Sequence, residues 1–278
     1  MPIAAPQQPA ALEDLPAASA IVFDNVSIAF QEHPVLDGIS FHLAQGETKA
    51  LFGVAGSGKS IILKLALGLI KPDAGRIWVL GEEVSALHEQ DLFELRRRIG
   101  MVFQESALFD SFTVRDNVAF RLLEEGKIGA GEIERRVSKA LSFVELEHTM
   151  DMFPGELSGG MRRRVAIARA MINQPEVLLY DSPTGGLDPV TSTTIIELLV
   201  KQRDVYNSSS LLVTHRLQDA FTMASHYFDG DENKMLPLPP GKQISMSFLV
   251  LREGHVIFDG SAHDLARSRD EYIREYIS

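Results

Sequence analysis

The stretch of the chain with the clearest potential for chemistry is GVAGSGKS, at residues 53–60. A glycine, four free positions and then Gly-Lys-Ser is the pattern of a phosphate-binding loop. Glycines let successive backbone N–H groups point inward at phosphate oxygens, and the helix that follows presents its positive end to the same anion. The lysine can reach the β- and γ-phosphates and the last hydroxyl can bind Mg²⁺. The residues are Gly53, Val54, Ala55, Gly56, Ser57, Gly58, Lys59 and Ser60.

The segments on either side of this loop fit a strand and a helix. Residues 48–52, TKALF, are typical of a short buried strand, and residues 61–70, IILKLALGLI, are typical of a helix. A plain glycine-rich turn is the alternative, and this context disfavours it. The sequence therefore predicts a strand, a phosphate loop and a helix in succession, as part of an α/β fold.

Two more polar residues follow predicted buried strands. Asp181 comes directly after the apolar run 177–180, and His215 comes directly after the run 210–214. An aspartate at the end of a strand is the usual second metal ligand of a phosphate-loop enzyme. The histidine on its own would more often be a satisfied core residue than a ligand. Its place in the same series of strand ends favours a functional role.

An amide and a second helix start complete the set of candidate site residues. Gln104 ends the predicted strand 99–104. Ser158, Gly159 and Gly160 precede an amphipathic helix, which makes another possible anion-binding helix start.

The composition is that of an ordinary globular protein. The chain has 278 residues, 45% hydrophobic and 23% charged, with 27 basic against 38 acidic side chains and a net charge of −11. The negative charge disfavours nucleic acid as a partner, and we interpret the clusters at 96–98 and 162–164 as solvated helix faces. The absence of cysteine excludes disulfides and thiolate metal sites. No apolar run reaches the roughly 18 residues of a membrane span, so we expect a soluble or peripheral protein.

The pattern of the sequence divides the chain into three parts. Residues 1–18, rich in Ala, Pro and Gln, predict a disordered tail, and residues 19–265 predict one α/β domain. That domain contains a helical subdomain at about 105–172 and an exposed loop insertion at about 229–247, where charges and prolines break the rhythm. Residues 266–278 predict a C-terminal helix with an apolar stripe, for docking on its own domain or on a partner subunit.

In this order, the phosphate loop, the strand-end residues and the LSGGM turn resemble the ATP-binding cassette (ABC) ATPases over about residues 20–265. The resemblance implies a phosphate-loop NTPase with a RecA-like core, an antiparallel β subdomain and a helical subdomain. It also implies that two copies meet head to tail around two ATP molecules with Mg²⁺. Residues 53–60 then correspond to the Walker A loop.

The roles of single residues are implied by the same resemblance. Phe30 resembles the aromatic residue that stacks on adenine, with a core phenylalanine as the alternative. Asp181 resembles the Walker B aspartate, and Gln104 the Q-loop residue that senses Mg²⁺ and the permease. The signature turn Ser158, Gly159 and Gly160 is similar to the one that covers the γ-phosphate on the opposite subunit. Asp188 lies in a loop similar to the D-loop, and His215 resembles the switch histidine that contacts the γ-phosphate.

The sequence departs from the family pattern after Asp181. Ser182 stands where the family has the glutamate general base, and Pro183-Thr184 and Leu187-Asp188-Pro189 keep the alignment in register. A serine hydroxyl cannot take a proton at neutral pH, and loss of a base commonly costs about 10²- to 10⁴-fold in rate. We therefore expect ATP binding and dimer closure to persist, with hydrolysis slow or dependent on His215 and Gln104. An engineered serine is the other possible origin of this departure.

One segment narrows the resemblance further. Residues 103–122, together with Met161 in the LSGGM turn, resemble the Mla/Mce type of lipid-transport ATPases. This implies a peripheral subunit at the cytoplasmic face of the inner membrane, bound to an integral permease and through it to an Mce-domain substrate-binding protein. The cargo would be phospholipid moving between inner and outer membranes, and residues 107–112 would help to receive the permease. The ATPase of another importer, of the polar amino acid type, and an ATP-operated clamp without turnover are the alternatives.

Overall fold

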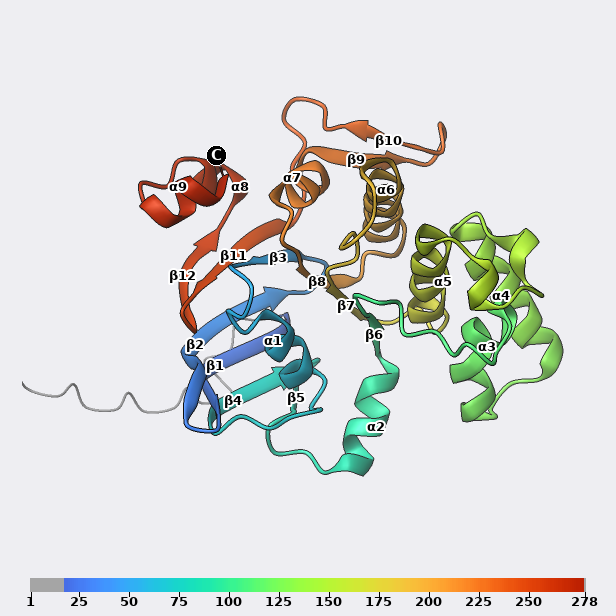
Figure 1. Ribbon diagram of the computed structural model, residues 1–278, viewed down its shortest axis with the longest axis horizontal. Helices are drawn as coiled ribbons and strands as arrows, with labels where there is room; N and C mark the ends of the chain where they lie inside the picture. The colour runs from blue at the N-terminus through green and yellow to red at the C-terminus, as the bar shows by residue number, and fades with distance from the viewer. Residues whose placement is uncertain (1–17, 278) are drawn as a thin grey trace, which may run out of the picture.

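The computed structural model describes residues 18–277, so the predicted tail lies outside the described residues except for Ala18. Two larger sheets, a two-stranded sheet and a separate group of helices make up the architecture (Figure 1). The strands are β1 (Ser19–Phe30), β2 (His33–Ala44), β3 (Thr48–Phe52), β4 (Ala74–Val79), β5 (Glu82–Glu83), β6 (Ile99–Val102), β7 (Val177–Asp181), β8 (Ser209–Val213), β9 (His226–Asp229), β10 (Lys234–Pro237), β11 (Met246–Arg252) and β12 (His255–Gly260). The α-helices are α1 (Lys59–Ala66), α2 (Glu89–Arg97), α3 (Val114–Glu125), α4 (Ala130–Phe143), α5 (Gly159–Met171), α6 (Pro189–Tyr206), α7 (Leu217–Ser225), α8 (Ala262–Ala266) and α9 (Glu271–Ile277).

The larger sheet has six strands in the order β12-β11-β3-β8-β7-β6, and all neighbours except β12 and β11 run parallel. Its central strands β3 and β8 are buried along their whole length. The apolar residues of TKALF in β3 and of SSLLV in β8 suit this position because both faces of a parallel sheet are covered. The predicted strand at 48–52 has the same bounds in the structure.

The smaller sheet is antiparallel, in the order β2-β1-β4-β5. One apolar core joins it to α1, α2 and one face of the larger sheet. Phe23 and Phe41 stack across the β1–β2 pair with ring centroids 4.6 Å apart. This packing fixes the hairpin of β1 and β2 beside the helix that follows the phosphate loop.

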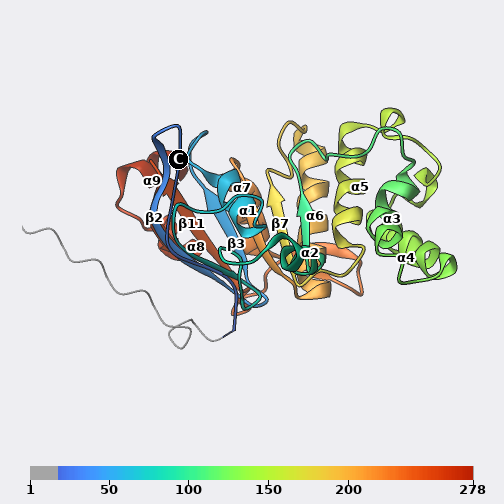
Figure 2. The ribbon, with the colours of Figure 1, turned by 90° about the horizontal axis from the view of Figure 1, so that it is seen from below.

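Helices α3, α4 and α5 form a group at one end of the molecule (Figures 1 and 2). Their buried residues share a second core with α6 and the opposite face of the larger sheet. Val118, Leu141 and Val165, one from each of the three helices, have no exposed surface. The group corresponds in the chain to the predicted helical subdomain at about 105–172.

The segment expected to be an exposed loop at about 229–247 includes part of a hairpin. Strands β9 and β10 pair antiparallel from His226 to Pro237 and lie along α6 (Figure 1). The charges and prolines of this segment lie mainly in the turn and after β10, where they leave the backbone pairing intact. The prediction of a loop was wrong for this part because β9 pairs with β10, a strand that the local sequence pattern does not reveal.

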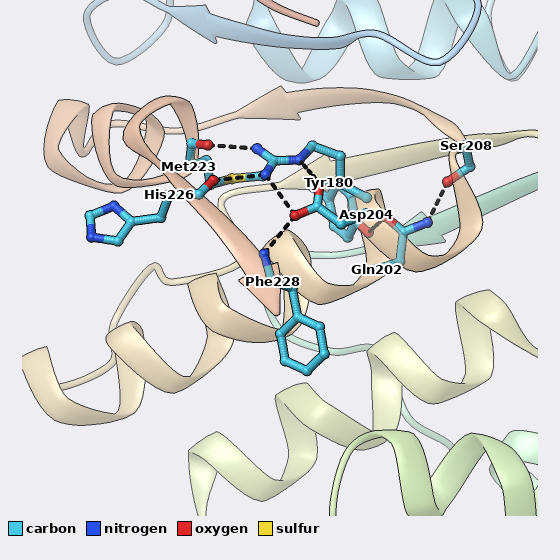
Figure 3. Close-up of polar contacts among 8 residues, drawn as sticks. Tyr180, Gln202, Asp204, Ser208, Met223, His226 and Phe228 are labelled. Atoms are coloured by element: carbon cyan, nitrogen blue, oxygen red, sulfur yellow. Dashed lines mark hydrogen bonds and ion pairs between the residues drawn. The ribbon is translucent and has the colours of Figure 1, made fainter. Parts of the chain in front are cut away.

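Arg203 and Asp204, near the end of α6, anchor this hairpin. Figure 3 labels Asp204 and the residues around β9 that take part, Met223, His226 and Phe228. Arg203 is 5% exposed and donates to the carbonyl oxygens of Met223, at 2.5 Å, and His226, at 2.8 Å. Asp204 pairs with the guanidinium at 2.7 Å and also accepts the Phe228 N–H at 2.7 Å. A partly buried ion pair thus supplies partners for three backbone groups around β9.

Two members of the arginine clusters, Arg96 and Arg163, do not belong to solvated helix faces, contrary to the interpretation of the sequence, whereas Arg98 is part-exposed and pairs with Glu82 and Glu176. Arg96 donates to the carbonyls of Leu67 at 2.8 Å and Gly68 at 3.1 Å, beyond the end of α1. Arg163 is only 4% exposed. These cations cover backbone carbonyls of other elements, and a helical pattern alone does not reveal such partners.

The C-terminal helix expected from residue 266 begins at Glu271 as α9, and a separate short helix, α8, precedes it at Ala262–Ala266. The side chains of Leu265 and Ile273 are buried beside Phe52 and Phe248 on one face of the larger sheet. The predicted apolar stripe therefore packs, in this part, on its own domain. No helix among residues 18–277 is long and apolar enough to cross a membrane.

We predict that Asp204→Ala lowers the free energy of unfolding by about 2 kcal/mol, because it removes the carboxylate that pairs with the buried Arg203 charge and accepts the Phe228 N–H. Chemical denaturation measures the change. Asp231→Ala, at an exposed position in the turn of the same hairpin, is the matched control and should change stability by less than about 0.5 kcal/mol. Equal losses in the two variants would contradict the anchoring role of Asp204.

Candidate nucleotide-binding site

The candidate site lies at the carboxyl edge of the larger sheet. Strands β3, β8, β7 and β6 run parallel, so the loops that follow them leave the sheet at the same edge. The register places Leu51 beside Val213 and Val213 beside Asp181. Two backbone hydrogen bonds extend the pairing of the strands by one residue. The Thr214 N–H donates to the Leu51 carbonyl at 3.3 Å, and the Ser182 N–H donates to the Val213 carbonyl at 2.9 Å.

The phosphate loop needs its glycines for steric reasons. Gly53 and Gly58 have φ angles of 153° and 94°, where side chains are strained. A Cβ on Gly53 would lie 2.5 Å from the Ser57 Oγ, and one on Gly58 would lie 2.7 Å from the Leu36 Cδ2. Helix α1 begins at this point with no side-chain hydrogen bond capping its first N–H groups. The loop and the helix start together fit a phosphate group.

Lys59 points back over the phosphate loop. Its ammonium donates to the carbonyls of Gly53 at 2.8 Å and Val54 at 2.7 Å, and to the Ser57 Oγ at 3.3 Å. Burial lowers the pKa of Lys59, and the negative charge of Asp181 opposes that shift. The ammonium is therefore held at the loop, at a desolvated position where an anionic oxygen would interact strongly with it.

Asp181 and His215 lie close enough to Lys59 for their charges to interact. Burial is the main cause of a lowered His215 pKa, the positive charge of Lys59 adds to it, and Asp181 opposes it. His215 is therefore neutral at pH 7 and keeps one ring nitrogen as a hydrogen-bond acceptor.

The donor set fits a magnesium ion that is held partly by its nucleotide. Among residues 18–277, no three His, Cys, Asp or Glu side chains converge on one point. Mg²⁺ commonly keeps few protein ligands and binds substrate phosphates instead. The Ser60 hydroxyl and the Asp181 carboxylate could supply such ligands, with the exposed Gln104 amide at the end of β6 as a third.

Ser182 lies directly at this edge and is buried, with 3% of its surface exposed. Its Oγ has no hydrogen-bond partner in the structure, and its φ angle of 45° is in the left-handed region. The backbone is held by two bonds, since Ser182 N–H donates to Val213 and the Ser182 carbonyl accepts from Gly185 at 2.9 Å. The residue thus sits in a fixed, locally strained turn.

A buried polar group that sequence reasoning missed supports the turn after Ser182. Asp219, in α7, accepts a hydrogen bond from the Thr184 hydroxyl and lies 3.6 Å from the Arg216 guanidinium. Burial raises the pKa of Asp219, and both neighbours oppose the shift. Arg216 also donates to the Ser192 Oγ at 2.6 Å. The network joins the loops after β7 and β8 to the start of α6, and a spacing of 35 residues between its members hides it in the sequence.

The glycine-rich turn at Ser158 and the loop at Asp188 are helix starts that contact each other. Ser158 caps α5 by accepting the Met161 N–H at 3.2 Å, and Asp188 caps α6 by accepting the Thr191 N–H at 3.0 Å. A Cβ on Gly160 would lie 2.4 Å from the Thr191 Cγ2, so the two helix starts pack closely. Helix α5 stands apart from α1, with β7 between them in both views (Figures 1 and 2).

Phe30 lies at the end of β1, opposite His33 in the smaller sheet. Its ring is 45% exposed. This exposure disfavours the alternative of a core phenylalanine and leaves a ring face accessible for stacking. The structure therefore brings Gln104, Asp181, Ser182 and His215 to the sheet edge beside the phosphate loop, and places Phe30, Ser158 and Asp188 elsewhere.

A parallel sheet with a phosphate loop after one strand and an aspartate at the end of another defines the class of phosphate-loop nucleoside triphosphatases. Residues 36–185 match the ABC transporter family. The chain belongs to this family and is an ABC ATPase, the ATP-binding, energy-coupling subunit of a transporter. The fold predicted from the sequence is confirmed.

Two relatives with different names share the same identity with the chain. It is 34% identical to "Protein TRIGALACTOSYLDIACYLGLYCEROL 3, chloroplastic" of Arabidopsis thaliana, over 89% of this chain and 70% of that protein. It is also 34% identical to the methionine import ATP-binding protein MetN 2 of Bacillus cereus, over 93% of this chain and 72% of that protein.

Two solved structures have the same fold. CbiO1 from Clostridium perfringens, part of the ABC transporter complex CbiONQ, superposes with a TM-score of 0.76 at 28% identity, covering 93% of this chain and 94% of CbiO1. The ATP-binding cassette MJ0796, in a dimeric post-hydrolysis state with ADP and phosphate, gives 0.72 at 28% identity, covering 87% of this chain and 98% of that cassette.

We predict that Ser182→Glu raises the steady-state ATPase rate of the intact complex by about tenfold or more, because it restores a carboxylate that can accept a proton from water. Phosphate release measures the rate. Ser182→Gln is the matched control, since it has the shape of glutamate without its basicity, and it should give no such increase. If the protein with Ser182 hydrolyses ATP as fast as Ser182→Glu or faster, the hypothesis that Ser182 weakens hydrolysis is contradicted.

Proposed function

We propose that this chain is the energy-coupling ATPase of an Mla/Mce-type transporter that moves phospholipid between the inner and outer membranes. The observation that carries the proposal is the segment at 103–122, which resembles the lipid-transport ATPases and forms an aromatic surface in the structure. The name of the Arabidopsis relative, which contains that of a galactolipid, supports a lipid as cargo.

The phosphate loop is half of a shared site in this proposal. Lys59 and the loop bind the phosphates of ATP, Ser60, Gln104 and Asp181 hold Mg²⁺, and Phe30 stacks on adenine. Ser158, Gly159, Gly160 and Asp188 serve the nucleotide of a second copy, which agrees with the separation of α5 from α1 (Figures 1 and 2). The dimeric structure of MJ0796 with ADP and phosphate supports the same arrangement. ATP then stabilises the closed dimer because the complete, shared site exists only in the closed state.

A groove beside the 103–122 segment suits a permease. It has a volume of about 580 Å³ and more apolar than polar lining surface, with Phe93 of α2 beside Phe103, Phe109 and Phe120 of the segment. The lining also includes Arg96, Arg97, Arg121 and Arg169. The rings of Phe109 and Phe112 lie 5.2 Å apart, and those of Phe109 and Phe120 lie 4.8 Å apart. Phe109 is 41% exposed, and exposed apolar surface of this kind marks contact sites for other proteins. We assign it to the cytoplasmic side of an integral permease, with an Mce-domain protein bound through that permease.

The backbone of this surface is held firmly in place. Asn117, which has no exposed surface, accepts the Phe109 N–H at 2.8 Å and donates to the carbonyls of Phe109 at 3.0 Å and Phe112 at 3.1 Å. One amide thus fixes both aromatic positions from α3. A firmly positioned apolar contact suits a part that must transmit force to a partner.

Methionine import is the competing function, because MetN is as similar to the chain as the Arabidopsis protein. Expression of the chain with its neighbouring genes, followed by purification, tests both. Reconstitution of the complex in proteoliposomes that contain fluorescent phospholipid, or that are supplied with labelled methionine, measures ATP-dependent transport of each. Lipid movement supports the proposal. Methionine movement, or purification without any membrane protein, contradicts it.

We predict that Phe109→Asp detaches the ATPase from its permease while nucleotide binding is retained, because a charge in the apolar groove cannot be desolvated without cost. Co-purification measures the association. Val205→Asp, at a 55% exposed apolar position of α6 away from this groove, is the control and should leave the complex intact. Unchanged assembly of the Phe109→Asp complex would count against this contact.

A further inference from the structure

Arg163 is a buried cation whose guanidinium donates to backbone carbonyls. It lies in α5, five residues after Ser158, and 4% of its surface is exposed. Burial lowers the pKa of Arg163, and the negative charges of Asp181 and Glu105 only oppose that shift. A buried charge is costly unless other polar groups replace water around it. The structure therefore has to supply them.

Backbone carbonyls from two loops of the site surround the guanidinium. Nη1 donates to the carbonyl of Phe103 and to that of Ser182, both at 3.2 Å, and Nη2 donates to the carbonyl of Gly185 at 3.4 Å. Phe103 directly precedes Gln104, and Ser182 directly follows Asp181. A planar guanidinium can serve several acceptors in fixed directions, which a lysine ammonium cannot do.

Each of these loops is already a closed turn, and Arg163 joins the two. Ser106 N–H donates to Phe103 at 3.0 Å, and Gly185 N–H donates to Ser182 at 2.9 Å. The carbonyl oxygens of Phe103 and Ser182, which close the two turns, therefore also accept hydrogen bonds from Arg163. Because Ser182 has a φ of 45°, its conformation is strained and persists only while such bonds hold it.

The two neighbouring arginines have different partners. Arg162 donates to the carbonyl of Leu157 at 2.5 Å, and Arg164 donates to that of Val144 at 3.0 Å, so both contacts stay within the 105–172 helical region. Arg163 differs from them because its hydrogen bonds reach the loops after β6 and β7. Movement of α5 is thereby transmitted to the turns that hold Gln104 and Ser182.

We propose that Arg163 is a positioning residue that couples the two nucleotide sites of the dimer. The signature turn at the start of its helix covers the partner's nucleotide, whereas the loops that it holds serve the nucleotide of its own chain. The inference rests on the proposed function in one respect, the head-to-tail dimer, and it is independent of the cargo. Closure over one nucleotide would then order the catalytic turn at the other.

The test compares Arg163→Met and Arg163→Lys with Arg164→Met in the full-length dimer. Arg163→Met removes the three donated bonds at similar side-chain length. Arg164→Met is the matched control, since it removes a carbonyl contact from the same helix that does not involve the catalytic loops. Phosphate release over a range of ATP concentrations gives kcat, KM and the Hill coefficient, a fluorescent ATP analogue reports nucleotide affinity, and thermal melting reports folding.

Coupling predicts that Arg163→Met lowers kcat about tenfold and brings the Hill coefficient to about 1, with nucleotide affinity changed by less than about threefold. Arg163→Lys should recover part of kcat while the Hill coefficient stays reduced, and Arg164→Met should keep the wild-type Hill coefficient. If Arg163→Met does not fold, Arg163→Lys tests the coupling instead. Its melting temperature should be near that of the wild type, and kcat, the Hill coefficient and nucleotide affinity are measured in the same way.

Two results would overturn the inference, and only the second of them would also overturn the proposed shared site of the dimer. A cooperative wild type whose Hill coefficient survives Arg163→Met and Arg163→Lys removes the role of Arg163 and leaves the proposed dimer standing. A wild-type chain that does not dimerise with ATP and hydrolyses it without cooperativity overturns both this inference and the shared site.

Discussion

The parallel register of β3, β8 and β7 decides where the chemistry of this protein can lie. Leu51, Val213 and Asp181 stand at one level of the sheet, so the residues that follow them emerge together. A shift of one residue between neighbouring strands would turn buried side chains to the opposite face. Such a shift is opposed because separate apolar cores cover the two faces of the sheet. The packing of the core thus sets the spacing between the phosphate loop and the polar strand ends.

The groups that follow these strands could be predicted because their signals are local. Residues 48–52 end in the apolar run Ala-Leu-Phe and precede a loop whose glycines serve a steric purpose, as the contacts at Gly53 and Gly58 demonstrate. Asp181 and His215 each follow a short apolar run, and parallel strands bring such positions to one edge. The order of these signals along the chain also indicated the family, which the match over residues 36–185 supports.

Contacts between distant segments could not be predicted in the same way. Arg163 resembles a surface residue in the sequence, yet its partners lie 60, 19 and 22 residues away. The same holds for Asp219, which meets Thr184 across 35 residues. In the hairpin of β9 and β10, charges and prolines suggested a loop, whereas Arg203 and Asp204 of α6 hold its first strand. Each case depends on carbonyl, amide or hydroxyl groups whose positions only the fold determines.

Ser182 separates two properties that usually occur together in such a site. Phosphate binding depends on the loop, the α1 start and Lys59, and none of these involves the side chain at 182. Activation of water depends on a base, and a buried hydroxyl without a partner cannot serve as one. ATP can therefore bind tightly, while its hydrolysis depends on the positioning of water and on electrostatics. Neutral His215 and the turn that holds Ser182 would supply these. In the dimer that we propose, ATP stabilises the closed state for as long as it is bound, so a slower chemical step would lengthen that state, and the timing of transport would depend on how firmly that turn is held.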